Sequence, residues 1–296
     1  MLKKILDIGV GSKGSVDETP TWLHELLSAG YIPYIATSEC LLSSFNATPF
    51  GQKVHPYLME NPEHGAFHEA YLLSNSLSFK SPDLKMPHWV LIDCALMQTA
   101  IVGFMKARAD LPERFLSHYR NDPSIDLDRL DYIPVSGQIA SPTADRKSLS
   151  GFSLFSLGSM LGAPRNLGLY TKALALEVYR AASYEWLYGI TQYDNPAIKI
   201  HGRFSSRMEI VQPIVSLHPK KDMTLIYRMA VDYDPQRLAE RPADVEPTFW
   251  MKADDIAGKN RMQSGIKDGK RYFLAPPFAV TRDHEIYLPI LEEKIK

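Results

Sequence analysis

Hydrophobic and polar positions along the chain predict strands and helices in irregular alternation. Apolar runs rich in β-branched and aromatic residues predict strands at 31–37, 88–96, 99–107, 132–140, 151–159, 185–192, 208–217 and 223–231. The runs 88–96 and 99–107 are separated only by two residues, which predicts a strand pair or hairpin. Short strands joined by close turns favour a largely antiparallel sheet.

Helices are predicted between these strands by a 3.6-residue apolar period and by end signals. The segment 20–29 follows a capping threonine, starts with a proline and is ended by Gly30. Residues 39–79 contain further helical patches, and 168–184 has the strongest helical period in the chain. A short helix opens at Asn195, which is followed by a proline.

The remaining segments are polar and rich in proline. Residues 108–130 are charged and predict an excursion from the core. After Asp232 the periodic pattern is lost, and only 271–280 and 284–291 are expected to pack back as short edge elements. The whole pattern predicts an α+β fold with a mixed, mostly antiparallel sheet flanked by helices.

Composition changes this picture little, but it excludes some function classes. The 296 residues are 45% hydrophobic and 23% charged, which is typical of a soluble globular protein. A net charge of −1 gives no electrostatic case for nucleic acid or for a membrane surface. The chain has two cysteines and contains no apolar run of membrane-spanning length, so we expect a cytoplasmic protein with no membrane span.

The sequence opens with Gly9-x-Gly11-x-x-Gly14 after a short apolar run. A dinucleotide-binding loop leads directly into a helix, whereas the next helix signal here comes several residues later, after two acidic residues. A strand end followed by a turn is therefore the favoured interpretation. The stretch also resembles the first motif of S-adenosylmethionine methyltransferases, with Glu39 as the ribose acid, and that alternative stays open.

A second glycine-containing loop does lead directly into a helix. Residues 165–170 connect the predicted strand 151–159 to the helix 168–184. Gly168 permits a close backbone approach, the N–H groups of the first helical turn are free to bind an anion, and Arg165 adds a cation suited to phosphate. The loop predicts a phosphate site, with an ordinary connection bearing a surface arginine as the alternative.

This loop resembles that of the GNAT acyltransferase superfamily, whose members carry Arg/Gln-x-x-Gly-x-Gly/Ala between their fourth strand and third helix. The resemblance implies that the loop binds the pyrophosphate of coenzyme A through Arg165, Asn166, Leu167, Gly168, Leu169 and Tyr170. Tyr170 stands where the family has a small residue, and its bulk would narrow the pyrophosphate cradle.

The segment 194–204 resembles a later GNAT motif, N-x-x-A-x-x-x-Tyr-x-x-x-Gly-Phe. Asn195 matches its asparagine, which implies a position near the donor, and His201 takes the place of the tyrosine that protonates the leaving thiolate. Histidine suits that role because its ordinary pKa is near 6.5; a buried structural histidine is the alternative. The resemblance also implies that backbone groups of 153–159, including Leu157, bind pantetheine, although 135–141 competes for this position.

The order of elements follows the same family. It implies a GNAT-like domain at 31–231, an N-terminal extension at 1–30 and a C-terminal extension at 232–296 packed on the domain. The strand 185–192 would be the fifth strand of the family, which splays from the fourth so that pantetheine lies between them.

The resemblance implies an N-acyltransferase with acyl-CoA or acetyl-CoA as donor. A small-molecule amine, held under the 39–79 helices, would attack the thioester directly. An acyl-carrier protein is the other candidate donor, and no metal is implied. A non-catalytic acyl-CoA-binding or sensor protein of the same fold stays open as an alternative function.

Two further features leave their roles open. No spacing singles out a general base; the candidates are Glu185, Tyr193 and Asp194, with Ser136 and Gln138 as groups that orient the acceptor. His64 and His68 lie four residues apart, a spacing compatible with a metal, but no third ligand accompanies them and no metal site is predicted.

Overall fold

The computed structural model describes residues 20–39, 42, 54–79, 86, 89–97, 99–162, 166–204, 207–232, 238 and 243–294. The strands are β1 (Tyr31–Thr37), β2 (His55–Leu58), β3 (Ala100–Ala107), β4 (Tyr132–Pro134), β5 (Ser136–Pro142), β6 (Ser148–Ser156), β7 (Trp186–Gln192), β8 (Met208–Gln212), β9 (Thr224–Ala230), β10 (Phe249–Lys252), β11 (Lys270–Leu274), β12 (Val280–Arg282) and β13 (Glu285–Lys294).

The helices are α2 (Thr21–Ser28), α4 (Gly65–Ser78), α5 (Trp89–Leu96), α6 (Glu113–Arg120), α7 (Gly158–Leu161), α8 (Leu167–Ala181), α9 (Ala197–Gly202) and α10 (Ile256–Lys267). Short 3₁₀ helices lie at Pro62–His64, Arg108–Asp110, Leu127–Arg129 and Lys221–Met223. Among the described residues, no helix is both long enough and apolar enough to cross a membrane.

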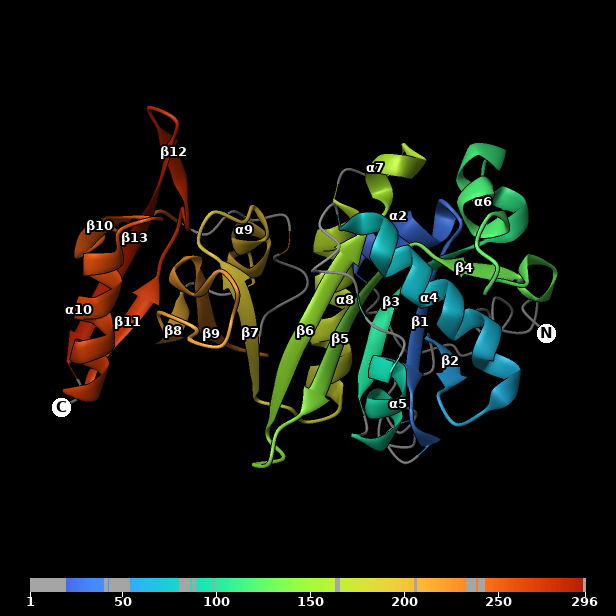
Figure 1. Cartoon of the computed structure of the whole chain (residues 1–296), viewed down its shortest axis with the longest axis horizontal. Coiled ribbons are helices and arrows are strands. Elements are labelled where there is room, and N and C mark those ends of the chain that lie inside the picture. The colour runs from blue at the N-terminus through green and yellow to red at the C-terminus, as the bar shows by residue number, and fades with distance from the viewer. Residues whose placement is uncertain are drawn as a thin grey trace, which may run out of the picture.

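All these strands join one sheet, in the order β10-β13-β11-β8-β9-β7-β6-β5-β3-β1-β2, with β12 beside β13 and β4 beside β3 (Figure 1). The pairs β1/β2 and β6/β7 are parallel, and the other pairs are antiparallel. The predicted α+β class with a mixed, mostly antiparallel sheet is therefore confirmed.

Helices α4 and α8 cover opposite faces of the middle of this sheet, with α4 in front and α8 behind in Figure 1. On β5 the alternation of side chains separates the two faces. Ser136 faces α8, because its hydroxyl accepts a hydrogen bond of 2.7 Å from Thr171. Gly137 faces α4, because a Cβ there would lie 2.6 Å from the ring of Tyr71. The sheet is thus buried on both sides around β5.

The prediction of a strand over 88–96 is wrong, because Trp89–Leu96 form helix α5. The run WVLIDCAL is apolar almost throughout, and a run of this length without alternation does not distinguish a buried strand from a buried helix. The run 99–107, predicted to pair with it, does form a strand, β3. This strand pairs with β1 on one side and with β4 and β5 on the other.

The C-terminal part is more regular than the sequence pattern indicates. Instead of short edge elements, residues 249–294 form three strands of the main sheet, the short strand β12 and the twelve-residue helix α10. β11 pairs with β8, which makes this part a continuation of the sheet. The helix was missed because its polar residues and three internal small residues, Gly258, Ser264 and Gly265, weaken the apolar period.

An ion-pair network connects β11, in this C-terminal part, to strands β8 and β9. Glu209 on β8 accepts hydrogen bonds from Arg228 on β9 and Arg271 on β11, the latter through two bonds of 2.9 and 3.0 Å. Burial tends to raise the pKa of Glu209, but the bonds from Arg271 and Arg228 outweigh it, so that its pKa lies below the usual value. The stabilisation is therefore present at neutral pH and is lost as the pH falls through this lowered pKa.

We expect Glu209→Gln to lower the free energy of unfolding at pH 7 by about 1–3 kcal/mol, because charge-assisted bonds from two arginines are lost. Urea unfolding of both proteins at pH 7 and pH 4 checks this, and the difference should shrink at the lower pH. Glu113→Gln is the matched control, since its pair with Arg120 lies in solvent. Equal effects of the two substitutions would rule out a structural role for the network.

Candidate active site

Strands β6 and β7 separate part of the way along their length. They pair in parallel from Ser148 opposite Trp186 to Gly151 opposite Gly189, and the pairing ends there although both strands continue. The end coincides with a bulge, since Ile139 of β5 faces Ser153 and Ala140 faces Gly151, leaving Phe152 as an extra residue. The two strands diverge beyond this point (Figure 1). The family resemblance implied such a splay between its fourth and fifth strands, which correspond to β6 and β7.

The start of helix α8 lies beside the diverging end of β6. The first intrahelical bond runs from the N–H of Tyr170 to the carbonyl of Asn166, at 3.0 Å. The N–H groups of Leu167, Gly168 and Leu169 therefore precede the first helical bond and point out of the helix start. Together with the helix dipole they form a site suited to an anion.

Gly168 lies where this helix start packs closely against β6 and α9. A Cβ at Gly168 would lie 3.5 Å from the Cβ of Ser156, at the end of β6, and 3.8 Å from a methyl group of Ile200 on α9. Its backbone has no positive φ, so the glycine is not required by conformation. A side chain longer than that of alanine would therefore crowd Ser156 and Ile200.

A small cavity lies in the gap between β6 and β7. Its volume is about 40 Å³, and it is lined by Gln138, Gly151, Phe152, Ser153, Leu154, Lys172, Leu187, Tyr188, Gly189, Ile190, His201 and Tyr227. Phe152 and Ile190 are exposed at 59% and 50%, whereas Lys172, Gln138 and His201 are almost completely buried. The gap thus combines an apolar exposed side with buried polar groups.

His201 lies in this cavity, with its ring 5.1 Å from that of Tyr227. Its Nδ1 atom is buried and has no hydrogen-bond partner among the described residues. Burial and the nearby charge of Lys172 hold the pKa of His201 well below 6.5. The imidazole is therefore neutral at pH 7, and its role as the acid for the leaving thiolate stays a prediction.

Lys172 is the residue of this site that sequence reasoning missed. It follows Thr171 on α8, is 1% exposed and has no ion pair or hydrogen bond within the described part of the chain. Burial lowers its pKa to about 7. A signal was available, because the helical period of 168–184 places Lys172 on the same apolar face as Ala173 and Leu176.

The bulk of Tyr170 is accommodated by the N-terminal helix. Its ring stacks on that of Trp22 in α2, with a centroid distance of 5.6 Å and an interplanar angle of 3°. This tyrosine takes the place of the small residue of the GNAT motif, and its side chain packs against α2.

The other residues predicted to bind the donor are either outside the described residues or already bonded within the protein, apart from Asn166. Arg165 lies outside the described residues, as do Gly9–Gly14. Asn166 directly precedes α8, and its side chain makes no capping bond. Leu157 already donates to Val135 and accepts from Met160 through its backbone, so it has little to offer pantetheine. The Asn195 side chain accepts the N–H of Ala197 at 2.8 Å and thereby stabilises the start of α9.

None of the candidate general bases lies free at the cavity. Glu185 pairs with Lys147 at 2.9 Å, and the hydroxyl of Tyr193 donates to the carbonyl of Pro213. Asp194 is exposed and does not line the cavity. Gln138 does line it, and its Oε1 atom is buried without a hydrogen-bond partner among the described residues.

The two histidines with metal-compatible spacing serve local structure. His64 Nδ1 accepts the N–H of Leu58 at 2.7 Å. His68 is buried, and burial together with His64 lowers its pKa to about 4. Within the described ranges, no group of three or more histidines, cysteines, aspartates or glutamates is placed to hold a metal ion.

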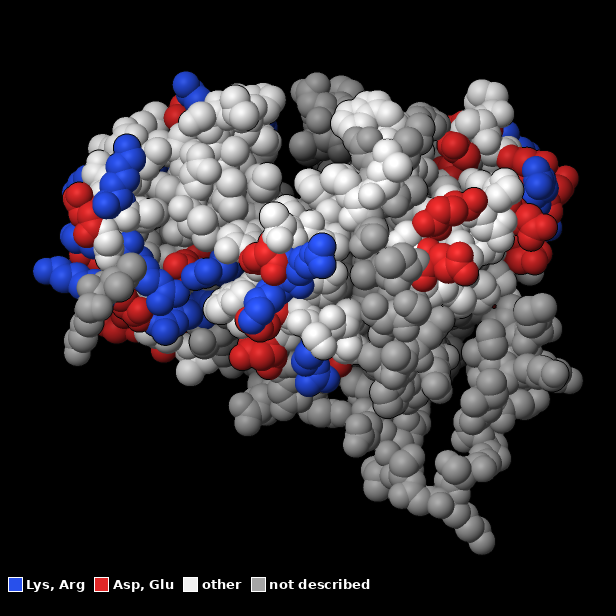
Figure 2. All heavy atoms as spheres, turned by 90° about the horizontal axis from the view of Figure 1, so that it is seen from below, with Lys and Arg blue, Asp and Glu red and all other residues white. Residues whose placement is uncertain are grey.

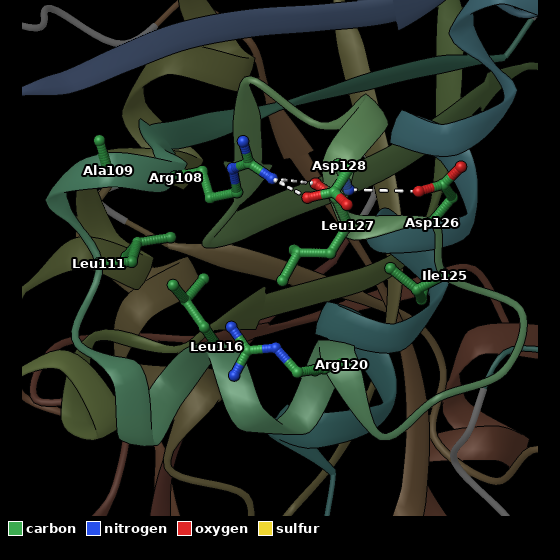
Figure 3. A pocket seen from close by; sticks show the side chains of 9 residues that line it. All are labelled: Arg108, Ala109, Leu111, Leu116, Arg120, Ile125, Asp126, Leu127 and Asp128. Atoms are coloured by element: carbon green, nitrogen blue, oxygen red, sulfur yellow. Dashed lines mark hydrogen bonds and ion pairs between the residues drawn. The ribbon is translucent and has the colours of Figure 1, made fainter.

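A larger hollow lies elsewhere, in the excursion 108–130. It encloses about 670 Å³ between α6 and the 3₁₀ helix at Leu127–Arg129 (Figure 3). Its two arginines are engaged, since Arg108 bonds to Asp128 and to the carbonyl of Leu127, and Arg120 pairs with Glu113. It is open, has no buried reactive group among its lining residues and is remote in the sheet from the β6/β7 gap, so we do not take it as the active site.

Figure 2 shows the face seen from below, where the Lys and Arg side chains of the described residues are interspersed with Asp and Glu.

Solved structures with a similar arrangement include several acetyltransferases. One assigned to the GNAT family, from Desulfovibrio desulfuricans, is 15% identical, with 58% of this chain and 94% of that one covered and a TM-score of 0.36. An N-acetyltransferase from Staphylococcus aureus is 11% identical, with 58% and 96% covered and a TM-score of 0.35. A tandem GNAT protein from the clavulanic acid biosynthesis pathway is 9% identical, with 72% and 66% covered and a TM-score of 0.31.

These matches are at the level of structure only, and their TM-scores are too low to carry a functional conclusion. No family model matches the sequence. No curated protein matches it either.

Proposed function

We propose that the protein is an N-acyltransferase that takes an acyl group from an acyl thioester and transfers it to an amine. The observation that carries this proposal is the start of α8 beside the parting of β6 and β7. Three N–H groups without intrahelical partners point out of the helix there, and the strands leave each other unpaired beyond Gly151 and Gly189.

The residues present fit a donor such as acetyl-CoA or a longer acyl-CoA. The N–H groups of Leu167, Gly168 and Leu169 would hold its pyrophosphate, with Arg165 as an added cation. A glycine at 168 leaves no side chain of its own at this helix start. The pantetheine arm would lie along the unpaired part of β6, whose backbone groups are free of β7. Phe152 and Ile190 would contact its apolar carbons.

The acceptor amine would approach from the face covered by α4. On that face Asn75 of α4 donates to the hydroxyl of Ser153 at 2.8 Å, and Tyr71 packs edge-on against Phe155. The amine would attack the thioester carbon, and the electron pair of the breaking C–S bond would go to sulfur. A proton donor near the sulfur then completes the step, and His201 or a group beside it would supply it.

Calorimetric titrations and one activity assay test the proposal. Coenzyme A and acetyl-CoA should bind with micromolar or tighter affinity in calorimetry, whereas S-adenosylmethionine should not bind. Acetyl-CoA with a panel of small amines should release free thiol only when amine is present. An acylated carrier protein offered in parallel distinguishes the two donor classes. If neither coenzyme A nor an acyl-carrier protein binds, the proposal is wrong.

A non-catalytic binding protein of the same architecture is the second candidate. It is favoured by the neutral state of His201 and by Tyr170 at the position of a small residue. Tight binding of acyl-CoA without thiol release across the amine panel would establish this candidate instead.

A further inference from the structure

The cavity between β6 and β7 contains polar groups that have no hydrogen-bond or ion-pair partner within the described part of the chain. Gln138 Oε1 and His201 Nδ1 are buried without partners, and Lys172 is buried without an ion pair or hydrogen bond within the described part of the chain. They come from three different elements, β5, α9 and α8, and meet in one space. Buried polar groups in proteins are nearly always satisfied, so this convergence indicates a ligand that completes them.

Lys172 differs from an ordinary structural lysine in its surroundings. The other ionisable side chains that line the cavity are His201 from α9, Tyr227 from β9 and Tyr188 from β7, and no described carboxylate lines it. By contrast Lys259, also fully buried, donates to the carbonyl oxygens of Asp222 and Ala253. Lys259 is thus satisfied by the fold, whereas Lys172 is not.

We infer that Lys172 is the group that gives its proton to the thiolate released when the donor thioester is cleaved. This inference rests on the proposed function and names a catalytic residue that the sequence motifs do not. The amine attacks the carbonyl carbon and its nitrogen loses one proton to solvent, the C–S bond breaks and its electron pair moves to sulfur. The Nζ proton of Lys172 then passes to the sulfur, and the neutral amine of Lys172 regains a proton from solvent.

The chemistry of the site suits this transfer. With a pKa of about 7, Lys172 carries its proton in about half of the molecules at pH 7. A free thiol has a pKa of about 8.5, so transfer from Lys172 to the thiolate is downhill. The nearby positive charge also explains why His201 remains neutral, since two cations in one buried space repel each other. His201 then acts as a neutral neighbour.

Coenzyme A and desulfo-coenzyme A, which differ by one sulfur atom, test the contact between Lys172 and the sulfur directly. Coenzyme A should bind the wild-type protein at least about tenfold more tightly than desulfo-coenzyme A, because the Lys172 amine bonds to the sulfur. In Lys172→Met the affinity for coenzyme A should fall to that for desulfo-coenzyme A, which itself should not change. Lys199→Met, at an exposed position of α9, is the control and should preserve the margin.

Kinetics with any amine that supports turnover supply the second readout. Lys172→Met should lower kcat by about 100-fold or more with KM for the donor unchanged, as expected for loss of a general acid. The wild-type kcat should fall as the pH rises above about 7, and this limb should be absent from the variant. A structural role alone would not change the shape of the pH profile.

The outcomes separate the two proposals. If the wild-type protein binds neither coenzyme A nor desulfo-coenzyme A, the proposed function fails. If it binds both with equal affinity, only the assignment of Lys172 is overturned, and this comparison needs no variant. Should Lys172→Met not fold, Lys172→Gln offers a polar replacement, and retention of the wild-type margin in that variant would equally overturn the assignment.

Discussion

Gly168→Leu is expected to weaken coenzyme A binding by at least about 100-fold, roughly 2.7 kcal/mol, while the protein remains folded. A leucine side chain would crowd Ser156 and Ile200 beside the helix start, where the phosphates would bind. The backbone at Gly168 has no positive φ, and a Cβ there makes only ordinary contacts, so the helix tolerates alanine. The loss in Gly168→Leu should therefore be steric.

Two substitutions serve as controls for this result. Gly168→Ala should bind coenzyme A nearly as well as the wild type, because its Cβ lies 3.5 Å or more from its neighbours. Gly65→Leu places the same side chain at the start of another helix, α4, where nothing lies within 4 Å of a Cβ. Calorimetry on all three variants measures the effect. Equal affinities of wild type and Gly168→Leu would show that phosphates do not lie at the start of α8.

The second large effect is on stability. Lys172→Met is expected to raise the free energy of unfolding at pH 7 by on the order of 4 kcal/mol, because a buried lysine whose pKa falls from 10.5 to about 7 costs that much. Methionine has a similar length and is apolar, so it can fill the same space. A group that destabilises the fold and is nevertheless buried is typical of a functional site.

The difference in stability between the wild type and Lys172→Met is expected to depend on pH. Between pH 7 and about 10.5 the unfolded chain binds the Lys172 proton and the native protein does not, so the wild-type stability should rise with pH over this window. In Lys172→Met this rise should be absent, and the gap between the two proteins should close toward high pH. Urea unfolding at pH 7, 8.5 and 10 measures both curves, with Lys199→Met as control. Parallel curves for wild type and Lys172→Met would contradict the burial of an unpaired lysine.

Much of the fold follows from short-range patterns. The helix 20–29, the strand 31–37 and the long helix at 168–184 appear nearly where their periods and end signals place them, as α2, β1 and α8. The strand predicted over 208–217 ends earlier, at Gln212 before Pro213, as a residue without an N–H requires. Such features depend on neighbouring residues and can be recognised from sequence.

The separation of β6 from β7 could not be derived from residue pattern alone. It depends on a bulge that places Phe152 opposite no residue of β5, and on the pairing of β6 with a strand more than thirty residues away. Sequence pattern gives the period of a strand but not where its neighbour stops pairing with it. Only the resemblance in the order of elements, with 185–192 as the fifth strand of the family, implied the splay.

The site residues divide in the same way. His201 and Gly168 were identified from a motif; the structure places His201 at the gap and Gly168 beside Ser156 at the end of β6. Gln138 was named from the sequence only as a group that could orient the acceptor. Lys172 carries no motif, and its significance appears only when three elements meet in one cavity. The unpartnered state of Lys172 is a property of tertiary packing, whereas the lysine within an apolar helical face was visible in the sequence.

Hydrogen–deuterium exchange with and without coenzyme A tests most directly whether the donor lies between β6 and β7. The amides of Leu167, Gly168 and Leu169 and those of β6 beyond Gly151 should become protected when the ligand is present. Protection limited to the hollow around Arg108 and Asp128, or no change at the start of α8, would contradict this location of the active site.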